Sequence, residues 1–108
     1  MLQEGGNVDA ALAMAQTARR GMPDSPSTAD TLGWAYYQKG VYPSAIDLFK
    51  EASKRNPDNP TYHYHLGLAY QKASQPALAR EQFERVLKIK PDYVDADGVR
   101  KALAELRS

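Results

Sequence analysis

Residues 26–59 read PSTADTLGWAYYQKGVYPSAIDLFKEASKRNPDN, and residues 60–93 read PTYHYHLGLAYQKASQPALAREQFERVLKIKPDY. Aligned at an offset of 34 residues, the two stretches are identical at ten positions, most of which hold small, apolar or turn-forming residues. The identical pairs are Pro26/Pro60, Leu32/Leu66, Gly33/Gly67, Ala35/Ala69, Tyr36/Tyr70, Ala45/Ala79, Phe49/Phe83, Lys54/Lys88, Pro57/Pro91 and Asp58/Asp92. An internal repeat of this length indicates an array of stacked supersecondary units.

The first part of each unit has the pattern of a helix. We expect these helices over residues 28–39 and 61–73. Gly40 provides a stop after the first of them, because glycine tolerates the left-handed conformation that ends many helices. No alternation of apolar and polar residues between turn signals indicates a strand. The sequence therefore predicts an all-α chain with six helices at most.

The second part of each unit also has the pattern of a helix. It is expected to begin near Pro43 and Pro76, because proline suits the first helical turn, where its missing N–H has no partner to lose. It is expected to end before Pro57 and Pro91, because proline disfavours the helical conformation in the residue that precedes it. Each 34-residue unit is thus a pair of helices.

Partial units flank the two full copies. Ala11, Ala18 and Pro23 repeat small and turn residues that stand 34 positions later. Downstream, apolar residues recur at a spacing that places them on one face of a helix. We expect one domain over residues 1–108, made of a partial repeat with its second helix only (7–25), two full repeats (26–59 and 60–93) and a C-terminal capping helix (94–108).

These spaced residues resemble the signature of the tetratricopeptide repeat (TPR), a unit with the pattern W-x2-L-G-x2-Y, then A-x3-F and P. The first unit matches at Leu32, Gly33, Tyr36, Ala45, Phe49 and Pro57, and the second at Leu66, Gly67, Tyr70, Ala79, Phe83 and Pro91. Ala29 and His63 stand where the signature has tryptophan. The resemblance implies a right-handed α-α superhelix, or solenoid, of antiparallel helix pairs.

The repeated residues also carry a packing hypothesis. Gly33 and Gly67 are small, so the two helices of each unit can approach closely. Phe49 and Phe83 are then expected to fill the space beside them. A single helix pair cannot bury its own apolar face, so neighbouring pairs must stack.

The resemblance implies a binding surface. In TPR proteins the first helices of successive units line a concave groove that receives a peptide or protein segment. Carried onto this sequence, the groove-facing residues are Asp30, Trp34, Tyr37, Gln38, Tyr64, His65, Leu68, Gln71 and Lys72. Trp34, Tyr37 and Tyr64 form an aromatic surface of the kind that dominates binding hot spots. The alternative is that Tyr37 and Tyr64 only follow the repeat pattern and cover helix surface.

One function known in the family is a clamp for a C-terminal carboxylate, built from lysine and asparagine on the first helices. Here Asp30, Trp34 and His65 occupy positions of that clamp. Because Asp30 would repel a carboxylate, we do not expect this function. The leading hypothesis is a non-catalytic interaction module that binds a peptide or partner protein.

The sequence gives no support to catalysis, a cofactor or a metal site. It contains no GxSxG or HExxH motif and no cysteine. His63 and His65 are two residues apart and point in directions about 200° apart on a helix, so they cannot share an ion. We interpret His63 as a packing residue and His65 as a groove-facing residue.

Composition limits the partners further. The net charge is +1, whereas nucleic acid or an acidic membrane surface calls for concentrated positive charge. No apolar run approaches the roughly 20 residues that a membrane helix needs. We therefore expect a protein or peptide partner, no nucleic acid and no membrane insertion. The sequence leaves the compartment open between cytoplasm and periplasm.

The first helix carries an alternative hypothesis. Val8, Ala11, Leu12 and Ala15 are expected to leave an apolar face uncovered, because the helix that would precede them in an array is missing. Either the chain is a piece of a longer array, or another copy covers this face. The alternative function is therefore oligomerisation, or a spacer segment in a larger assembly protein.

Overall fold

The computed structural model describes the backbone of residues 3–106 and the side chains of residues 7–106. Within this range the chain forms α-helices and no strand, which confirms the all-α prediction. The six helices of the described range are α1 (Gln3–Gly21), α2 (Pro26–Lys39), α3 (Tyr42–Arg55), α4 (Pro60–Lys72), α5 (Pro76–Ile89) and α6 (Ala96–Leu106). Residues 107 and 108, which end the predicted capping segment, lie outside the described range.

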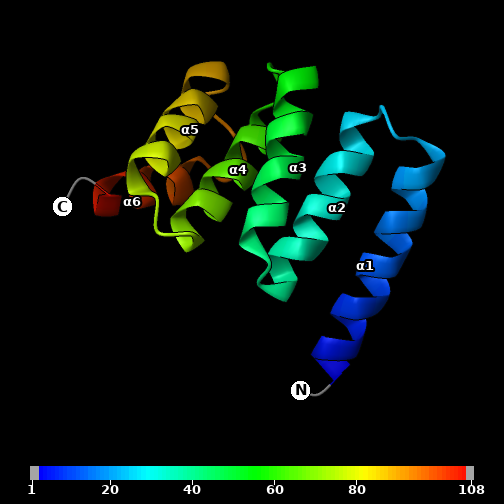
Figure 1. Ribbon diagram of the computed structural model, residues 1–108. Coiled ribbons are helices and arrows are strands. Elements are labelled where there is room, and N and C mark those ends of the chain that lie inside the picture. The colour runs from blue at the N-terminus through cyan, green and yellow to red at the C-terminus, as the bar shows by residue number, and fades with distance from the viewer. Residues whose placement is uncertain (1–2, 107–108) are drawn as a thin grey trace.

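The helices form a stacked array. Each helix packs against the next one along the chain, and α2 also contacts α4. Figure 1 shows this order across the molecule, with α1 at one end and α6 behind α5 at the other. The array measures 37 × 32 × 23 Å. Such a helical repeat places α2 and α4, the first helices of the two full units, next to each other.

Helices α2 and α4 begin earlier than the sequence predicted. They start at Pro26 and Pro60, because the residue before each proline caps the helix. The side-chain oxygen of Ser25 accepts a hydrogen bond of 3.4 Å from the backbone N–H of Thr28. In α4 the Asn59 oxygen accepts from Thr61 at 2.9 Å. A capping oxygen followed by proline at the first position is a strong start signal.

The two units end their first helices in the same left-handed turn. Gly40 has a φ of +87° and closes α2, as the sequence predicted. Ser74, 34 residues later, adopts a φ of +62° without being glycine. The backbone N–H groups of Val41 and Gln75 donate to the carbonyl oxygens of Tyr36 and Tyr70, both at 2.9 Å. The repeat geometry therefore imposes the turn even where the residue disfavours it.

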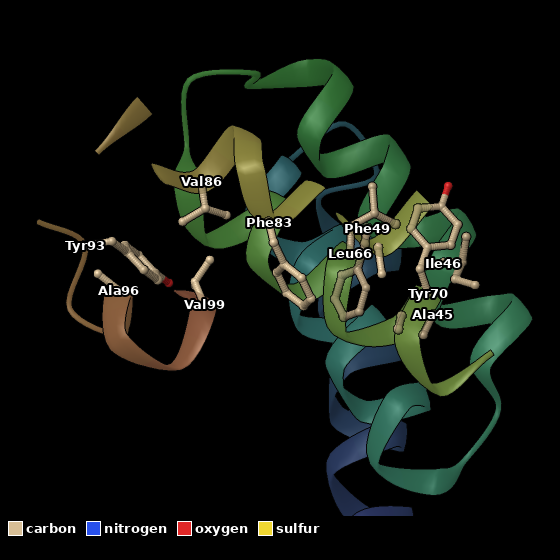
Figure 2. Packing of buried hydrophobic residues seen from close by; sticks show 12 residues of the cluster. Ala45, Ile46, Phe49, Leu66, Tyr70, Phe83, Val86, Tyr93, Ala96 and Val99 are labelled. Carbon is tan, nitrogen blue, oxygen red and sulfur yellow. The ribbon is translucent and has the colours of Figure 1, made fainter. Parts of the chain in front are cut away.

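The core confirms the predicted approach of the two helices in each unit. A Cβ atom added at Gly33 would lie 2.7 Å from Cε1 of Phe49, and one at Gly67 would lie 2.6 Å from Cε1 of Phe83. Both phenylalanine rings are fully buried. Figure 2 shows Phe49, Leu66 and Phe83 together in the middle of this core. The missing side chains of the glycines thus make room for the rings.

Helix α6 closes the far end of the array. Tyr93, Ala96 and Val99 are buried and belong to the same core cluster as Phe83. In Figure 2 they lie on the segment beside Val86. The exposed side of α6 carries charged residues, Arg100 and Lys101 among them. No helix in the described range is long and apolar enough to cross a membrane.

The first helix differs from its prediction. Ala15 is only 4% exposed and packs against Leu32 and Ala35, so its assignment to an uncovered face was wrong. Leu12 is half-buried against the same cluster. The reason is that α2 covers the side of α1 on which these residues lie. An ion pair also fixes α1, since Arg19 donates to both carboxylate oxygens of Glu51 in α3, at 2.6 and 2.7 Å.

Candidate functional site

Six aromatic rings form one continuous series, which we name the aromatic row. In order the row is Tyr42, Tyr37, Trp34, His65, Tyr64 and Tyr93. The successive ring centroids lie 5.6, 4.9, 4.5, 6.2 and 5.7 Å apart. Such distances lie within the range at which aromatic rings attract one another. The row therefore runs from the first residue of α3, over α2 and α4, to the segment before α6.

Trp34 occupies the middle of the aromatic row. Its indole stacks on Tyr37 with an angle of 15° between the rings and contacts the tilted ring of His65 at an angle of 30°. Trp34 is half-buried and also packs against the main core. The residue therefore serves the fold as well as the surface. Truncating it to alanine removes stacking inside the molecule, so such a variant loses stability in addition to any binding.

His65 joins the two helices of the row. Its ring contacts Trp34 of α2 and Tyr64 of α4, and it lies 5.4 Å from the ring of Phe49. Its Nδ1 is 2.8 Å from Oδ1 of Asp30. The side chains of His65 and Asp30 are only 18% and 15% exposed, so solvent screens this contact weakly. This polar pair links α4 to α2 at the middle of the aromatic row.

The tyrosines at the centre of the row stay protonated at neutral pH. Burial, followed by the hydroxyls of Tyr42 and Tyr64, raises the pKa of Tyr37. Burial, followed by the carboxylate of Asp95 and the hydroxyl of Tyr93, raises the pKa of Tyr64. These effects favour the neutral form. Both hydroxyls are therefore available as hydrogen-bond donors.

The remaining residues of the predicted groove occupy different places. Leu68 is half-buried and packs against the core, Gln71 is half-buried, and Lys72 is exposed at the end of α4. Gln38 instead lines a pocket between α1 and α2, together with Asn7, Val8 and Ala11. The structure thus brings the predicted aromatic residues together and places Gln38 apart from them. Sequence reasoning did not assign Tyr42 or Tyr93 to the groove, because Tyr42 is the first residue of α3 and Tyr93 lies between α5 and α6, outside the first helices of the units.

A second hollow lies between α3 and α5, away from the aromatic row. Lys50, Lys54 and Arg85 are among the residues of its walls, and His63 lies at its floor. His63 is 3% exposed, with Nδ1 2.8 Å from Oε1 of Gln82 and Nε2 2.8 Å from the carbonyl oxygen of Pro57. It is a packing residue, as the sequence predicted. Across the described residues, no group of three or more potential metal ligands gathers at one place.

Family comparisons agree with the repeat seen in the chain. Residues 33–74 match the TPR repeat, and residues 60–93 match the tetratricopeptide repeat. The chain belongs to the tetratricopeptide-repeat family. Members of this family are generally non-catalytic modules that interact with other proteins. No curated protein matches this TPR chain.

Solved structures of other proteins share the fold. The chaperone SycD of Yersinia enterocolitica, in complex with a peptide of the translocator YopD, has a TM-score of 0.86 at 16% identity, over 97% of this chain and 83% of that chain. SycD has also been solved as an alternative dimer, with the same values. The first TPR of Spaghetti (RPAP3), bound to the HSP90 peptide SRMEEVD, has a TM-score of 0.83 at 22% identity, over 96% and 83% of the two chains.

Proposed function

We propose that this chain is a non-catalytic interaction module that binds a peptide or protein segment over the aromatic row. The row itself carries the proposal. Its four central rings, Tyr37, Trp34, His65 and Tyr64, are half-buried and lie on the first helices of two successive TPR units. Aromatic side chains dominate binding hot spots, because they offer a large, rigid contact area at a small cost in entropy. SycD and Spaghetti, which share the fold, were solved with bound peptides.

The proposed ligand is not held by a terminal carboxylate. The position where a clamp would place a lysine holds Asp30, whose carboxylate is engaged by His65 at 2.8 Å. The neighbouring position holds Trp34, which has no positive charge. A carboxylate at this place would meet a like charge in a poorly screened environment. Recognition along the aromatic row must therefore rest on apolar contact and on neutral hydrogen bonds.

Position-specific crosslinking tests the proposed surface. A photoreactive amino acid replaces Lys72 at the end of α4 or, as the matched control, Lys88 at the end of α5. Both lysines are exposed in the last turn of a helix. Lys72 lies seven residues after His65 and so on the same face of α4, whereas Lys88 lines a pocket with Pro57.

The proposed surface predicts that proteins of the source organism crosslink to position 72 and not to position 88. The same capture should decline when Trp34→Ala is added, with circular dichroism to show that the variant is folded. Equal capture from the two lysine positions would contradict the proposal. Capture from position 72 that does not decline in the Trp34→Ala variant would also contradict it.

A second candidate function is self-association through α1. The observation that favours it is the exposure of Met14, which is 72% exposed on the same helix as the exposed Ala11 and half-buried Val8. An exposed apolar patch of this kind is typical of an interface. Sedimentation at high protein concentration tests it, and Met14→Glu should shift a dimer to monomer. A monomer at every concentration would exclude self-association through this helix.

A further inference from the structure

The aromatic row presents hydrogen-bond donors that the fold does not use. Among the hydrogen bonds of the described residues, none involves the indole N–H of Trp34 or the hydroxyls of Tyr37 and Tyr64. In the same part of the chain, every buried side-chain nitrogen or oxygen has a partner. These three polar groups therefore reach solvent. The hydroxyl of Tyr93 differs, because it is 2.9 Å from Oγ1 of Thr61.

The rings, in contrast, already contact one another, and the indole of Trp34 is stacked on Tyr37. Trp34 lies against Tyr37 and His65, and Tyr64 lies against His65, Phe83 and Tyr93. To a bound ligand the row consequently presents the edges of its rings and the polar groups of Trp34, Tyr37 and Tyr64. Because the rings hold one another in place, little side-chain entropy is lost when a ligand binds.

This arrangement discriminates between classes of peptide backbone. A ligand that covers the row must supply acceptors for its donors, because a buried donor without a partner loses its hydrogen bond to water. The carbonyl groups of an α-helix are already bonded within the helix, so a helical ligand supplies few acceptors. An ordinary extended strand supplies carbonyls, but it also brings a backbone N–H at every residue, and among these three polar groups only the two tyrosine hydroxyls can accept. A polyproline II segment has free carbonyls and, at each proline, no N–H.

We infer that the aromatic row binds an extended, proline-rich segment of a partner protein. The backbone carbonyls of that segment accept hydrogen bonds from Trp34, Tyr37 and Tyr64, and its pyrrolidine rings pack on the exposed ring edges. Proline-rich segments bind aromatic-lined grooves in other domains, where their preformed polyproline II helix lowers the entropy lost on binding. The inference rests on the proposed function and names the class of its partner.

Fluorescence anisotropy of a labelled decaproline peptide tests the inference directly. Two labelled peptides of the same length serve as comparisons, a glycine–serine decamer that is flexible and an alanine-rich decamer that favours helix. The variants Tyr37→Phe and Tyr64→Phe remove one hydroxyl each and keep the ring. Tyr36→Phe is the matched control, because the Tyr36 hydroxyl accepts a hydrogen bond from Gln16 of α1 and lies outside the row.

We expect decaproline to bind more tightly than either comparison peptide. Each of the two variants in the row should weaken this binding by about two- to twelvefold, the range for one net hydrogen bond, while Tyr36→Phe leaves it unchanged. Equal binding of the three peptides would overturn the inference, as would tighter binding of the alanine-rich peptide or wild-type affinity in both row variants. If position 72 still captures partners by crosslinking, only the proline-rich class fails. If it captures none, the proposed function fails too.

Discussion

Replacing Gly67 by alanine perturbs the closest contact in the core. The added methyl carbon would lie 2.6, 2.8 and 3.0 Å from Cε1, Cδ1 and Cζ of the Phe83 ring. That ring is fully buried, so it cannot move away without displacing other core atoms. Overpacking of a dense core costs about 1–3 kcal/mol, and three such contacts point to the upper half of this range. Alanine recovers about 1 kcal/mol of helix propensity. We expect the free energy of unfolding to fall by about 1–2 kcal/mol.

A double-mutant cycle isolates this contact. Phe83→Leu removes two of the three clashing atoms, Cε1 and Cζ, and leaves a side chain that can change rotamer. In that background Gly67→Ala should cost little, or should stabilise by up to about 1 kcal/mol through helix propensity. The expected coupling free energy is therefore about 1–3 kcal/mol, well above the usual departure of distant sites from additivity. Urea denaturation followed by circular dichroism measures all four proteins.

Gly98→Ala is the matched control for Gly67→Ala. Gly98 also lies inside a helix, but the nearest atom to an added Cβ is the Tyr64 hydroxyl at 3.9 Å, an ordinary contact. This variant should raise the free energy of unfolding by about 0.5–1 kcal/mol. The reasoning is refuted if Gly67→Ala costs the same with phenylalanine and with leucine at position 83, because steric conflict with the ring would then not be the cause.

Three further predictions concern the turns and the α1–α3 contact. Ser74→Gly should raise the free energy of unfolding by about 1 kcal/mol in urea denaturation, because Ser74 holds a left-handed φ of +62°. Gly40→Ser, at the equivalent turn, should lower it by a similar amount in the same assay, since Gly40 has a φ of +87°. The hydrogen bond from Arg19, opposed by partial burial, lowers the pKa of Glu51. The stability that results is present above the pKa of a glutamate in the unfolded chain, and it is lost as the pH falls through the lower pKa of Glu51 in the folded chain. Glu51→Gln should therefore reduce the dependence of the melting temperature on acid pH.

Much of the fold could be predicted from the sequence, because the same packing residues occur in both repeat units. A glycine and a phenylalanine recur 34 residues apart, and each pair belongs to one closely packed helix pair, Gly33 with Phe49 and Gly67 with Phe83. Residue size alone decides which helices can approach, so the inference needs no knowledge of the superhelix. Gly40 is a similar case, since its identity fixes the turn that it can make.

Other features depend on packing between helices, which the residues near each position do not reveal. Ser74 carries no glycine signal, yet it adopts the left-handed turn because the packing of α4 on α5 requires the chain to reverse there. Ala15 was expected on an open face, but α2 covers it. An alanine is equally compatible with a crowded contact and an exposed position. Only the angle between α1 and α2 distinguishes these environments.

The same limit applies to the candidate site. Periodicity placed Trp34, Tyr37 and Tyr64 on the first helices of the two units, and the structure brings them into one row. Periodicity could not predict the contact between Trp34 and His65, because that contact depends on how α2 is positioned against α4. His65 was interpreted only as a residue that faces the groove. Its bond to Asp30 and its stacking on Trp34 make it the link between helices. The aromatic row is therefore preorganised by contacts within the fold, and under the proposed function its free polar tips select among ligands.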